Sequence, residues 1–277
     1  MENIVLQAEH LCTSFFTRNG EVKAVNDVSI SVPRGKVVGI VGEFGCGKSM
    51  TARSIIGLLK YPGKIVSGSV TLAGKELTTL SEHEMSTVRG EEIGMIFQEP
   101  MTSLNPVMKV GRQVQEALLL HRKLTRREAR AEGLRMFKKV GISEPERWYD
   151  CYPHELSGGL RQRVMIAMAM ICRPKLIIAD EPTTALDVTV EAQILQLMMQ
   201  LKNETGSGIM LISHNLGVIA QMCDYVYVMY AGRVVEQAET FELFSHPAHP
   251  YTVGLMSSVA SLDSDRGQLD TIPGVVP

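Results

Sequence analysis

The sequence lacks the features that mark membrane-spanning, exported and disulfide-linked proteins. Its longest uncharged apolar run, from Val164 to Cys172, ends at Arg173 and is too short to cross a bilayer. The N-terminus has no basic segment followed by an apolar stretch, so we expect no export signal. Five cysteines occur without a CxxC pair, which argues against a zinc site and a disulfide framework. These absences predict a soluble intracellular protein.

Excess charge and repetition are also missing. The 28 Lys and Arg residues nearly balance the 30 Asp and Glu residues, which leaves a formal net charge of −2. A protein that binds nucleic acid through bulk electrostatics needs a basic stripe, so we expect no nucleic-acid partner. No internal repeat or low-complexity stretch occurs. With 277 residues, 45% of them hydrophobic, the chain is long enough to bury a core in one large domain or two lobes.

Apolar patterns divide the chain into zones, and the first 80 residues or so favour strands. Residues 28–32 alternate apolar with polar side chains, whereas the unbroken apolar run at 37–41 is typical of a strand buried on both faces of a parallel sheet. From about residue 90 to about 165 the pattern favours helices. Thr125–Glu128 and Ser143–Glu146 both have the spacing of a capping box at a helix start.

Alternation of strands and helices returns in the last part of the chain. Apolar runs at 176–179 and 209–212 predict strands, and a helix is expected between them at about 189–202. Ala231-Gly232 lies between two further β-prone runs, which predicts a hairpin. The order of the zones indicates an α/β core interrupted by a helical insertion.

A phosphate-binding loop follows the buried run at 37–41. The segment from Gly42 to Ser49 fits G-x-x-x-x-G-K-[ST] directly after a predicted strand and before a predicted helix. Its glycines let successive N–H groups face inward, and a helix N-terminus adds a positive dipole. Lys48 is expected to reach the β- and γ-phosphates, and the Ser49 hydroxyl to coordinate Mg²⁺. A glycine-rich turn without a ligand is the plainer alternative. The predicted nucleotide-binding residues of the loop are Gly42, Glu43, Phe44, Gly45, Cys46, Gly47, Lys48, Ser49 and Met50.

Two carboxylates end the apolar run at 176–179. Consecutive side chains of a strand point to opposite faces, so Asp180 and Glu181 cannot share one role if the strand continues. Asp180 suits the Mg²⁺ ion, and Glu181, just past the strand, is the candidate general base for an attacking water. A buried strand that ends in acidic residues by chance is the alternative, which the Lys48 loop disfavours.

A third motif carries a family resemblance. Residues 156–163, Leu-Ser-Gly-Gly-Leu-Arg-Gln-Arg, closely resemble the signature of ATP-binding cassette (ABC) ATPases and precede the Asp180 strand as in that family. Gln98 resembles the Q-loop residue of the family, Ala185-Leu186-Asp187 its D-loop, and His214 its switch histidine.

Two further segments resemble the oligopeptide/dipeptide importer branch of this family. They are residues 97–106 and residues 246–252, the latter followed by Ile272-Pro273-Gly274. The resemblance extends from about residue 5 to residue 277. It implies a P-loop NTPase (RecA-like) α/β core with an antiparallel β subdomain and an inserted α-helical subdomain.

The resemblance also implies domain boundaries. Residues 1–90 would hold the β subdomain and the first part of the nucleotide-binding core, and residues 91–165 the helical insertion with the Q-loop and the signature. Residues 166–240 would complete the core. Residues 241–277 would form the C-terminal extension of the oligopeptide-transporter type.

By the same resemblance, the site is shared between two subunits that face head to tail. Ser157, Gly158 and Gly159 of one subunit would meet the γ-phosphate that Lys48 of the other holds, and His214 would contact the same phosphate. Gln98 would act in catalysis and as a metal ligand. An aromatic ring, Phe15 or else Phe16, would stack on the adenine. Plainer readings stay open, namely a helix cap at Ser157, a structural histidine and two core phenylalanines.

The implied function is that of a peripheral ATPase subunit on the cytoplasmic face of the cell membrane, which powers import of oligopeptides or dipeptides. Its implied partners are a second ABC ATPase (a different chain or a second copy), two membrane permease subunits and, indirectly, an extracytoplasmic solute-binding protein. ATP and Mg²⁺ are the expected cofactors. Import of nickel or another small solute, and a non-transport ABC ATPase, remain alternatives. A GTPase is disfavoured because no guanine-reading motif occurs.

Several residues depart from the family pattern. Phe44 stands where serine is usual, and we expect it to slow turnover or change selectivity without abolishing nucleotide binding. Cys46 lies beside a helix N-terminus and Lys48, which should lower the pKa of its thiol. Asn215 replaces the more usual aspartate. Members of the importer branch that this chain resembles often have a cysteine-bearing tail after the Ile-Pro-Gly segment, which can hold an iron–sulfur cluster. The five cysteines of the present sequence lie elsewhere, so we expect no such cluster in it.

Overall fold

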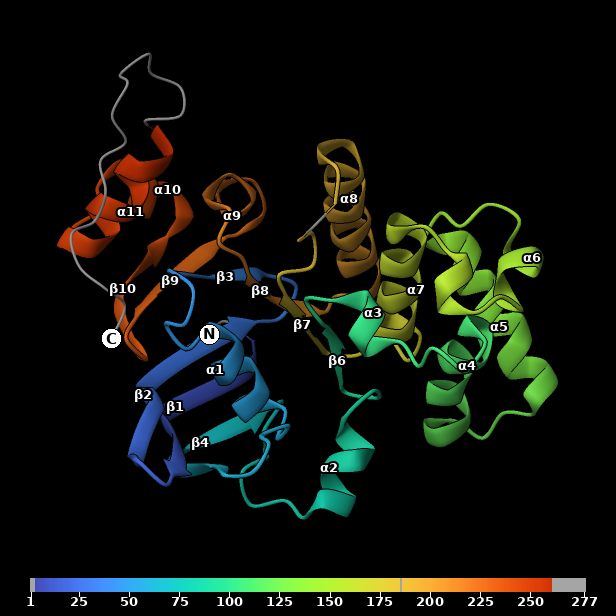
Figure 1. Cartoon of the computed structure of the whole chain (residues 1–277), viewed down its shortest axis with the longest axis horizontal. Helices are drawn as coiled ribbons and strands as arrows, with labels where there is room; N and C mark the ends of the chain where they lie inside the picture. Colours follow the sequence, from blue (N-terminus) through green and yellow to red (C-terminus); the bar gives the residue numbers. More distant parts are fainter. Residues whose placement is uncertain (1–2, 185, 261–277) are drawn as a thin grey trace. The chain divides into compact units, whose positions relative to one another are not determined.

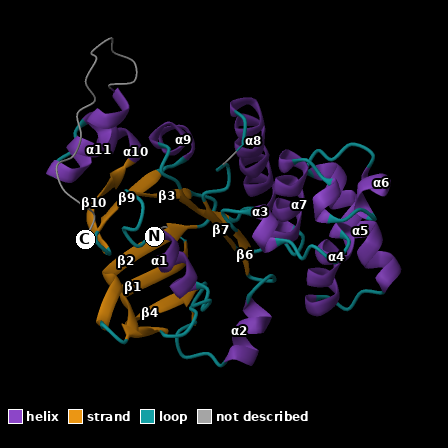
Figure 2. Ribbon diagram, in the orientation of Figure 1, coloured by secondary structure: helices purple, strands orange, loops and turns teal. Residues whose placement is uncertain are grey.

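The computed structural model describes residues 3–184 and 186–260. They form two compact units. The first consists of the described residues up to Leu80 and from Met210 onward, and the second of Ser81–Ile209. Figure 1 traces the elements along the chain, and Figure 2 distinguishes the strand-rich parts from the helical ones. Among the described helices, none combines the length and the apolar character that a membrane span requires.

The first unit contains an antiparallel sheet with the strand order β2-β1-β4-β5. The residues of alternating polarity lie in β2, where Val28, Ile30 and Val32 are buried, as the period of two predicts. Leu11 of β1 pairs with Val28 across the ladder. The strands are β1 (Ile4–Thr17), β2 (Gly20–Pro33), β4 (Gly63–Leu72) and β5 (Lys75–Glu76).

The same unit also contains a mostly buried set of parallel and antiparallel strands. β3 (Val37–Val41) is buried throughout and pairs in parallel with β9 (Tyr225–Tyr230). β9 and β10 (Arg233–Glu239) form the predicted antiparallel hairpin, with positive φ at both turn residues, Ala231 and Gly232. The helices of the unit are α1 (Lys48–Ile55), α9 (Leu216–Met222), α10 (Thr240–Ser245) and α11 (Pro250–Ala260).

The second unit combines a short parallel strand pair with a group of helices. β6 (Ile93–Ile96) pairs with β7 (Leu176–Asp180), and both are fully buried. β8 (Gly208–Ile212) begins in this unit and ends in the first. The helices are α2 (Glu82–Val88), α3 (Pro100–Ser103), α4 (Val110–His121), α5 (Arg126–Lys139), α6 (Pro145–Tyr149), the 3₁₀ turn η1 (Pro153–Glu155), α7 (Gly158–Met170) and α8 (Val188–Thr205).

The strand expected at 176–179 and the helix expected at about 189–202 are present as β7 and α8, whereas two local expectations for this unit are wrong. β6 lies inside the zone predicted as helical, because four apolar residues in a row have no period that separates a buried strand from a helix. Thr125 does form a capping box with Glu128. At the second predicted start, α6 is preceded by Glu144 with φ +51° and no side-chain cap, so Ser143 is not its N-cap.

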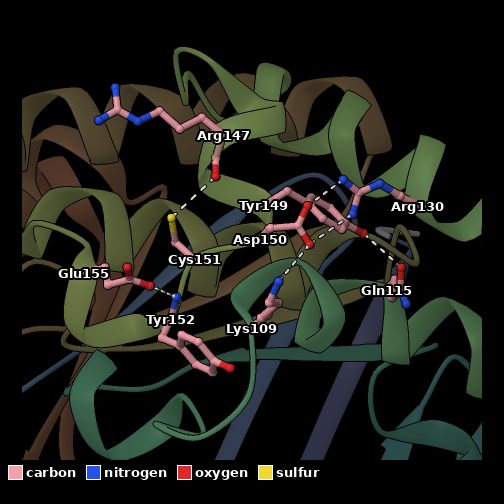
Figure 3. A network of polar contacts seen from close by, with 9 residues as sticks. All are labelled: Lys109, Gln115, Arg130, Arg147, Tyr149, Asp150, Cys151, Tyr152 and Glu155. Atoms are coloured by element: carbon pink, nitrogen blue, oxygen red, sulfur yellow. Dashed lines mark hydrogen bonds and ion pairs between the residues drawn. The ribbon is translucent and has the colours of Figure 1, made fainter.

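A polar network around Tyr149 and Asp150 joins helices α4, α5 and α6 (Figure 3). The Asp150 carboxylate accepts from Arg130 at 2.7 Å and pairs with Lys109 at 3.5 Å. The buried Tyr149 hydroxyl donates to Gln115 at 3.2 Å, and burial raises the pKa of Tyr149 to about 12. Hydrogen bonding from Arg130 holds the pKa of Asp150 below its ordinary range. These contacts link the three helices to one another.

Candidate functional site

The predicted phosphate-binding loop has the strand–loop–helix geometry that its motif requires. β3 ends at Val41 and α1 begins at Lys48. Gly42 has φ +148°, and a Cβ there would lie 2.2 Å from the Met229 carbonyl oxygen. Gly47 has φ +104°, and a Cβ there would lie 2.5 Å from a backbone oxygen. Only glycine fits either position.

Lys48 is almost fully buried and points back along the loop. Its Nζ donates to the carbonyl oxygens of Gly42 at 2.7 Å and Glu43 at 2.8 Å, and lies 3.7 Å from Sγ of Cys46. Two backbone oxygens therefore compensate for burial of the ammonium group. The positively charged ammonium group that would bind a phosphate therefore lies within the loop.

Cys46 contradicts the expectation of a lowered thiol pKa. The residue is 1% exposed, and burial raises the pKa of its thiol despite the opposing charge of Lys48. Loss of solvation of a thiolate outweighs one neighbouring cation here. The buried thiol is therefore poorly suited to reaction with thiol reagents.

Phe44 and His214 lie close together in the first unit. The Phe44 side chain is 72% exposed, and its ring centroid is 6.4 Å from that of His214 at an angle of 47°. His214 lies two residues after the end of β8 and is exposed. Asn215 caps α9 and accepts from the N–H of Gly217 at 3.0 Å, a role that the sequence analysis did not anticipate.

The remaining loop residues have simpler environments. Ser49 and Met50 lie in the first turn of α1 and are half-buried. Gly45 is exposed, with φ +83°. The N–H of Glu43 donates to the hydroxyl of Tyr251, a contact that the sequence analysis missed.

In the second unit the two carboxylates adopt the arrangement expected at a strand end. Asp180 is the last residue of β7 and is 3% exposed. Glu181 follows it with φ +49°, a left-handed conformation that turns the chain out of the strand. This turn lets the two adjacent carboxylates take different roles.

Two side chains donate to the same oxygen of Glu181. Nε2 of Gln98 lies 2.9 Å from Oε2 of Glu181, and Oγ1 of Thr184 also lies 2.9 Å from it. Gln98 and Glu181 were predicted separately, and the structure brings them together. Thr184 was not predicted, although it follows Glu181 by only three residues.

The signature segment begins a helix, as expected. Ser157 is the N-cap of α7 and accepts from the N–H of Leu160 at 3.3 Å, so the helix-cap reading is correct for its hydroxyl. Ser157 and Gly158 are nevertheless exposed, and Gly159 is half-buried. Their backbone is open to a ligand or partner. A cavity of about 430 Å³ in this unit is lined by Gly158 together with Gln98 and Thr184.

The adenine-binding candidates lie on β1, and the geometry does not select between them. Phe15 is half-buried, and its ring packs so closely on Gly63 that a Cβ there would lie 2.6 Å from it. Phe16 is 44% exposed, and Nζ of Lys64 lies 4.6 Å above its ring centroid. Stacking of Phe15 or Phe16 on the adenine therefore stays a prediction.

Some predicted residues lie outside the described ranges, namely Ala185 of the D-loop segment and the Ile272-Pro273-Gly274 segment. Within the described ranges, no group of three or more His, Cys, Asp and Glu side chains gathers as a metal site. The carboxylate of Asp180 is nevertheless a suitable ligand for Mg²⁺, which usually takes its other ligands from phosphates and water.

Comparison with known families agrees with this geometry. The model of the ABC transporter family matches residues 25–184, more than half of the chain. The chain therefore belongs to the ABC transporter family and is one of its ATPases. The model of the oligopeptide/dipeptide transporter C-terminal region matches residues 235–277.

Curated relatives cover nearly the whole chain. It is 51% identical over 275 residues to the oligopeptide transport ATP-binding protein OppD of Salmonella typhimurium, covering 99% of this chain and 82% of that protein. It is 49% identical over 274 residues to the dipeptide transport ATP-binding protein DppD of Bacillus subtilis, again covering 99% and 82%.

Solved structures confirm the predicted fold class. The ATP-binding cassette MJ0796, in a dimeric post-hydrolysis state bound to ADP and Pi, matches with a TM-score of 0.77 and 26% identity over 85% of this chain and 98% of that one. cbiO1 of Clostridium perfringens, part of the ABC transporter complex cbiONQ, matches with a TM-score of 0.74 and 30% identity over 88% and 92%.

Proposed function

We propose that this chain is the ATP-hydrolysing subunit of an importer that carries oligopeptides or dipeptides across the cytoplasmic membrane. The observation that carries the proposal is the match of residues 235–277 to the oligopeptide/dipeptide C-terminal region, in a chain with an intact phosphate loop. Relatives named for oligopeptide and dipeptide transport support the same solute class.

We infer that the predicted residues would divide the chemistry of ATP hydrolysis. Lys48 would bind the β- and γ-phosphates, and the Ser49 hydroxyl would be a ligand for Mg²⁺. Asp180 and Gln98 are the other candidate ligands for the metal, which would neutralise charge on the phosphates. Glu181 accepts a proton from the attacking water, and the donors on its Oε2 hold the carboxylate in one orientation.

A nucleotide site of this kind is completed by a second subunit. The backbone of Ser157, Gly158 and Gly159, of which the first two are exposed, would face the γ-phosphate bound by the partner. His214 would contact the γ-phosphate bound by its own loop. The partner is a second ABC ATPase, either a different chain or another copy. The dimeric state of the MJ0796 cassette supports such pairing. Phe15 or Phe16 would stack on the adenine.

Coupling to transport requires membrane partners. We infer that two permease subunits dock on the helical insertion near Gln98, and that an extracytoplasmic solute-binding protein acts through them. The chain then lies on the cytoplasmic face of the membrane and binds no nucleic acid. The domain boundaries inferred from the sequence, at about residues 90, 165 and 240, are retained in this proposal.

Uptake by cells tests the proposal. Cells from which this chain has been deleted are supplied with the wild-type chain or with Lys48→Ala, and uptake of a labelled dipeptide and a labelled tetrapeptide is measured. Wild type should restore peptide uptake and Lys48→Ala should not. Restored uptake of nickel with no effect on either peptide would contradict the peptide assignment and leave the ATPase role intact.

A further inference from the structure

The C-terminal region contacts the phosphate loop through one tyrosine. Tyr251, in the first turn of α11, lies within the segment that matches the oligopeptide/dipeptide region. Its hydroxyl accepts from the backbone N–H of Glu43 at 2.8 Å. Glu43 is the second residue of the loop, and Tyr251 is only 7% exposed. A partly buried hydrogen bond therefore joins two residues that are 208 positions apart in the sequence.

Several contacts hold the Tyr251 side chain and backbone in place. Its ring packs on Tyr230 of β9 with 4.7 Å between the centroids. Its N–H donates to Nδ1 of His249 at 3.1 Å. Just before α11, the carboxylate of Glu236 from β10 accepts from the N–H groups of Ala248 at 2.7 Å and His249 at 3.0 Å. The start of the helix is thus anchored to the β9–β10 hairpin.

The peptide groups of Glu43 are held from two sides. Tyr251 accepts from its N–H, and Nζ of Lys48 donates to its carbonyl oxygen. When Lys48 turns a donor toward a phosphate, its hold on that carbonyl weakens. The contact from Tyr251 does not involve Lys48, and it can keep the start of the loop in place. Burial raises the pKa of Tyr251 to about 12, so the hydroxyl stays protonated over the working pH range.

We propose that Tyr251 is a positioning residue that holds the phosphate loop ready for ATP, so that the C-terminal region sets the nucleotide affinity of this chain. The inference rests on the proposed ATP binding and adds a residue outside the known motifs. It also gives a local role to the segment at 246–252, which the sequence analysis identified only by resemblance. We assign the role to binding because the Tyr251 hydroxyl accepts from a backbone N–H of the phosphate loop, the part of the chain that would bind the phosphates.

Tyr251→Phe removes the hydroxyl and keeps the ring that packs on Tyr230. Titration with a fluorescent ATP analogue and steady-state ATPase kinetics should show Kd and KM raised about three- to tenfold, the effect of one lost hydrogen bond, with kcat changed less than about twofold. Tyr61→Phe is the matched control, because the Tyr61 side chain is 98% exposed, and it should behave like wild type.

A second variant and a stability measurement distinguish the loss of this contact from a general loss of packing. Glu236→Gln keeps the shape of the side chain while it weakens the anchor of the α11 start, and it should raise Kd in the same direction by a smaller factor. Thermal unfolding reports whether each variant is folded. Equal Kd values for wild type, Tyr251→Phe and Tyr61→Phe would overturn the role of Tyr251. Failure of the wild type to bind ATP would instead overturn the proposed function on which this role depends.

Discussion

Lys48 in the first unit and Glu181 in the second are both buried and charged, yet they are held by different kinds of partner. Lys48 donates to two backbone carbonyls of its own loop. Glu181 accepts from two side chains, those of Gln98 and Thr184. A backbone partner survives most substitutions, whereas a side-chain partner is lost with one.

This difference explains why the loop accepts an unusual residue. Phe44 stands where the resemblance to the ABC family leads us to expect serine, and its side chain is exposed to solvent while the loop keeps its hydrogen bonds. The Glu181 carboxylate depends on two side chains, so a substitution of either one removes a hydrogen bond. We expect substitutions around Glu181 to change turnover strongly, and side-chain changes in the loop to have smaller effects on binding.

The largest effect is expected at Glu181 itself. Glu181→Gln keeps the size of the side chain but removes the basic oxygen, and turnover should fall about 10²- to 10⁴-fold. ATP affinity should stay near that of wild type, because the partners of Lys48 belong to the loop backbone. Phosphate release and nucleotide titration measure the two quantities. Glu82→Gln, a neutralisation of an exposed carboxylate, is the control. Unchanged turnover in Glu181→Gln would assign the base elsewhere.

Loss of one donor to Glu181 should have the next largest effect. Thr184→Val replaces the hydroxyl with a methyl group, and turnover should fall about 10- to 100-fold if the hydrogen bond to the carboxylate orients it. Thr87→Val is the control, because the Thr87 hydroxyl donates only to a carbonyl of its own helix. A Thr184→Val enzyme with wild-type turnover would show that Gln98 alone orients Glu181.

The smallest effect is expected for a side chain of the loop. Phe44→Ser adds a hydroxyl that can donate to a phosphate and removes the ring near His214. ATP should bind more tightly by at most about tenfold, and turnover should rise. Isothermal titration and ATPase assays measure both. If neither quantity changes, Phe44 has no influence on the nucleotide, and the hypothesis that it slows turnover fails.

The local pattern of residues was enough to predict much of this fold. The run at 37–41 and the motif after it predicted a strand, a loop and a helix start, and all three are present. The end of the strand at Asp180, with Glu181 just past it, was also predicted. These features depend on residues that are neighbours in the sequence, which is why pattern alone found them.

The predictions that were wrong or missing depend on physical causes that a local sequence pattern does not contain. The thiol pKa of Cys46 depends on burial by segments distant in sequence, and burial outweighed the nearby lysine. β6 is apolar on both faces and has no diagnostic period. The contact between Glu43 and Tyr251 joins residues 208 positions apart, so only the folded chain reveals it.

The pairing of two ATP-bound subunits is the central claim of the proposed mechanism, and light scattering of the Glu181→Gln protein with ATP and Mg²⁺ tests it most directly. The account predicts that ATP binds and that the particle doubles in mass, either alone or when a second ABC ATPase of the same importer is added. A protein that binds no ATP, or that binds ATP and stays monomeric under both conditions, would contradict the claim.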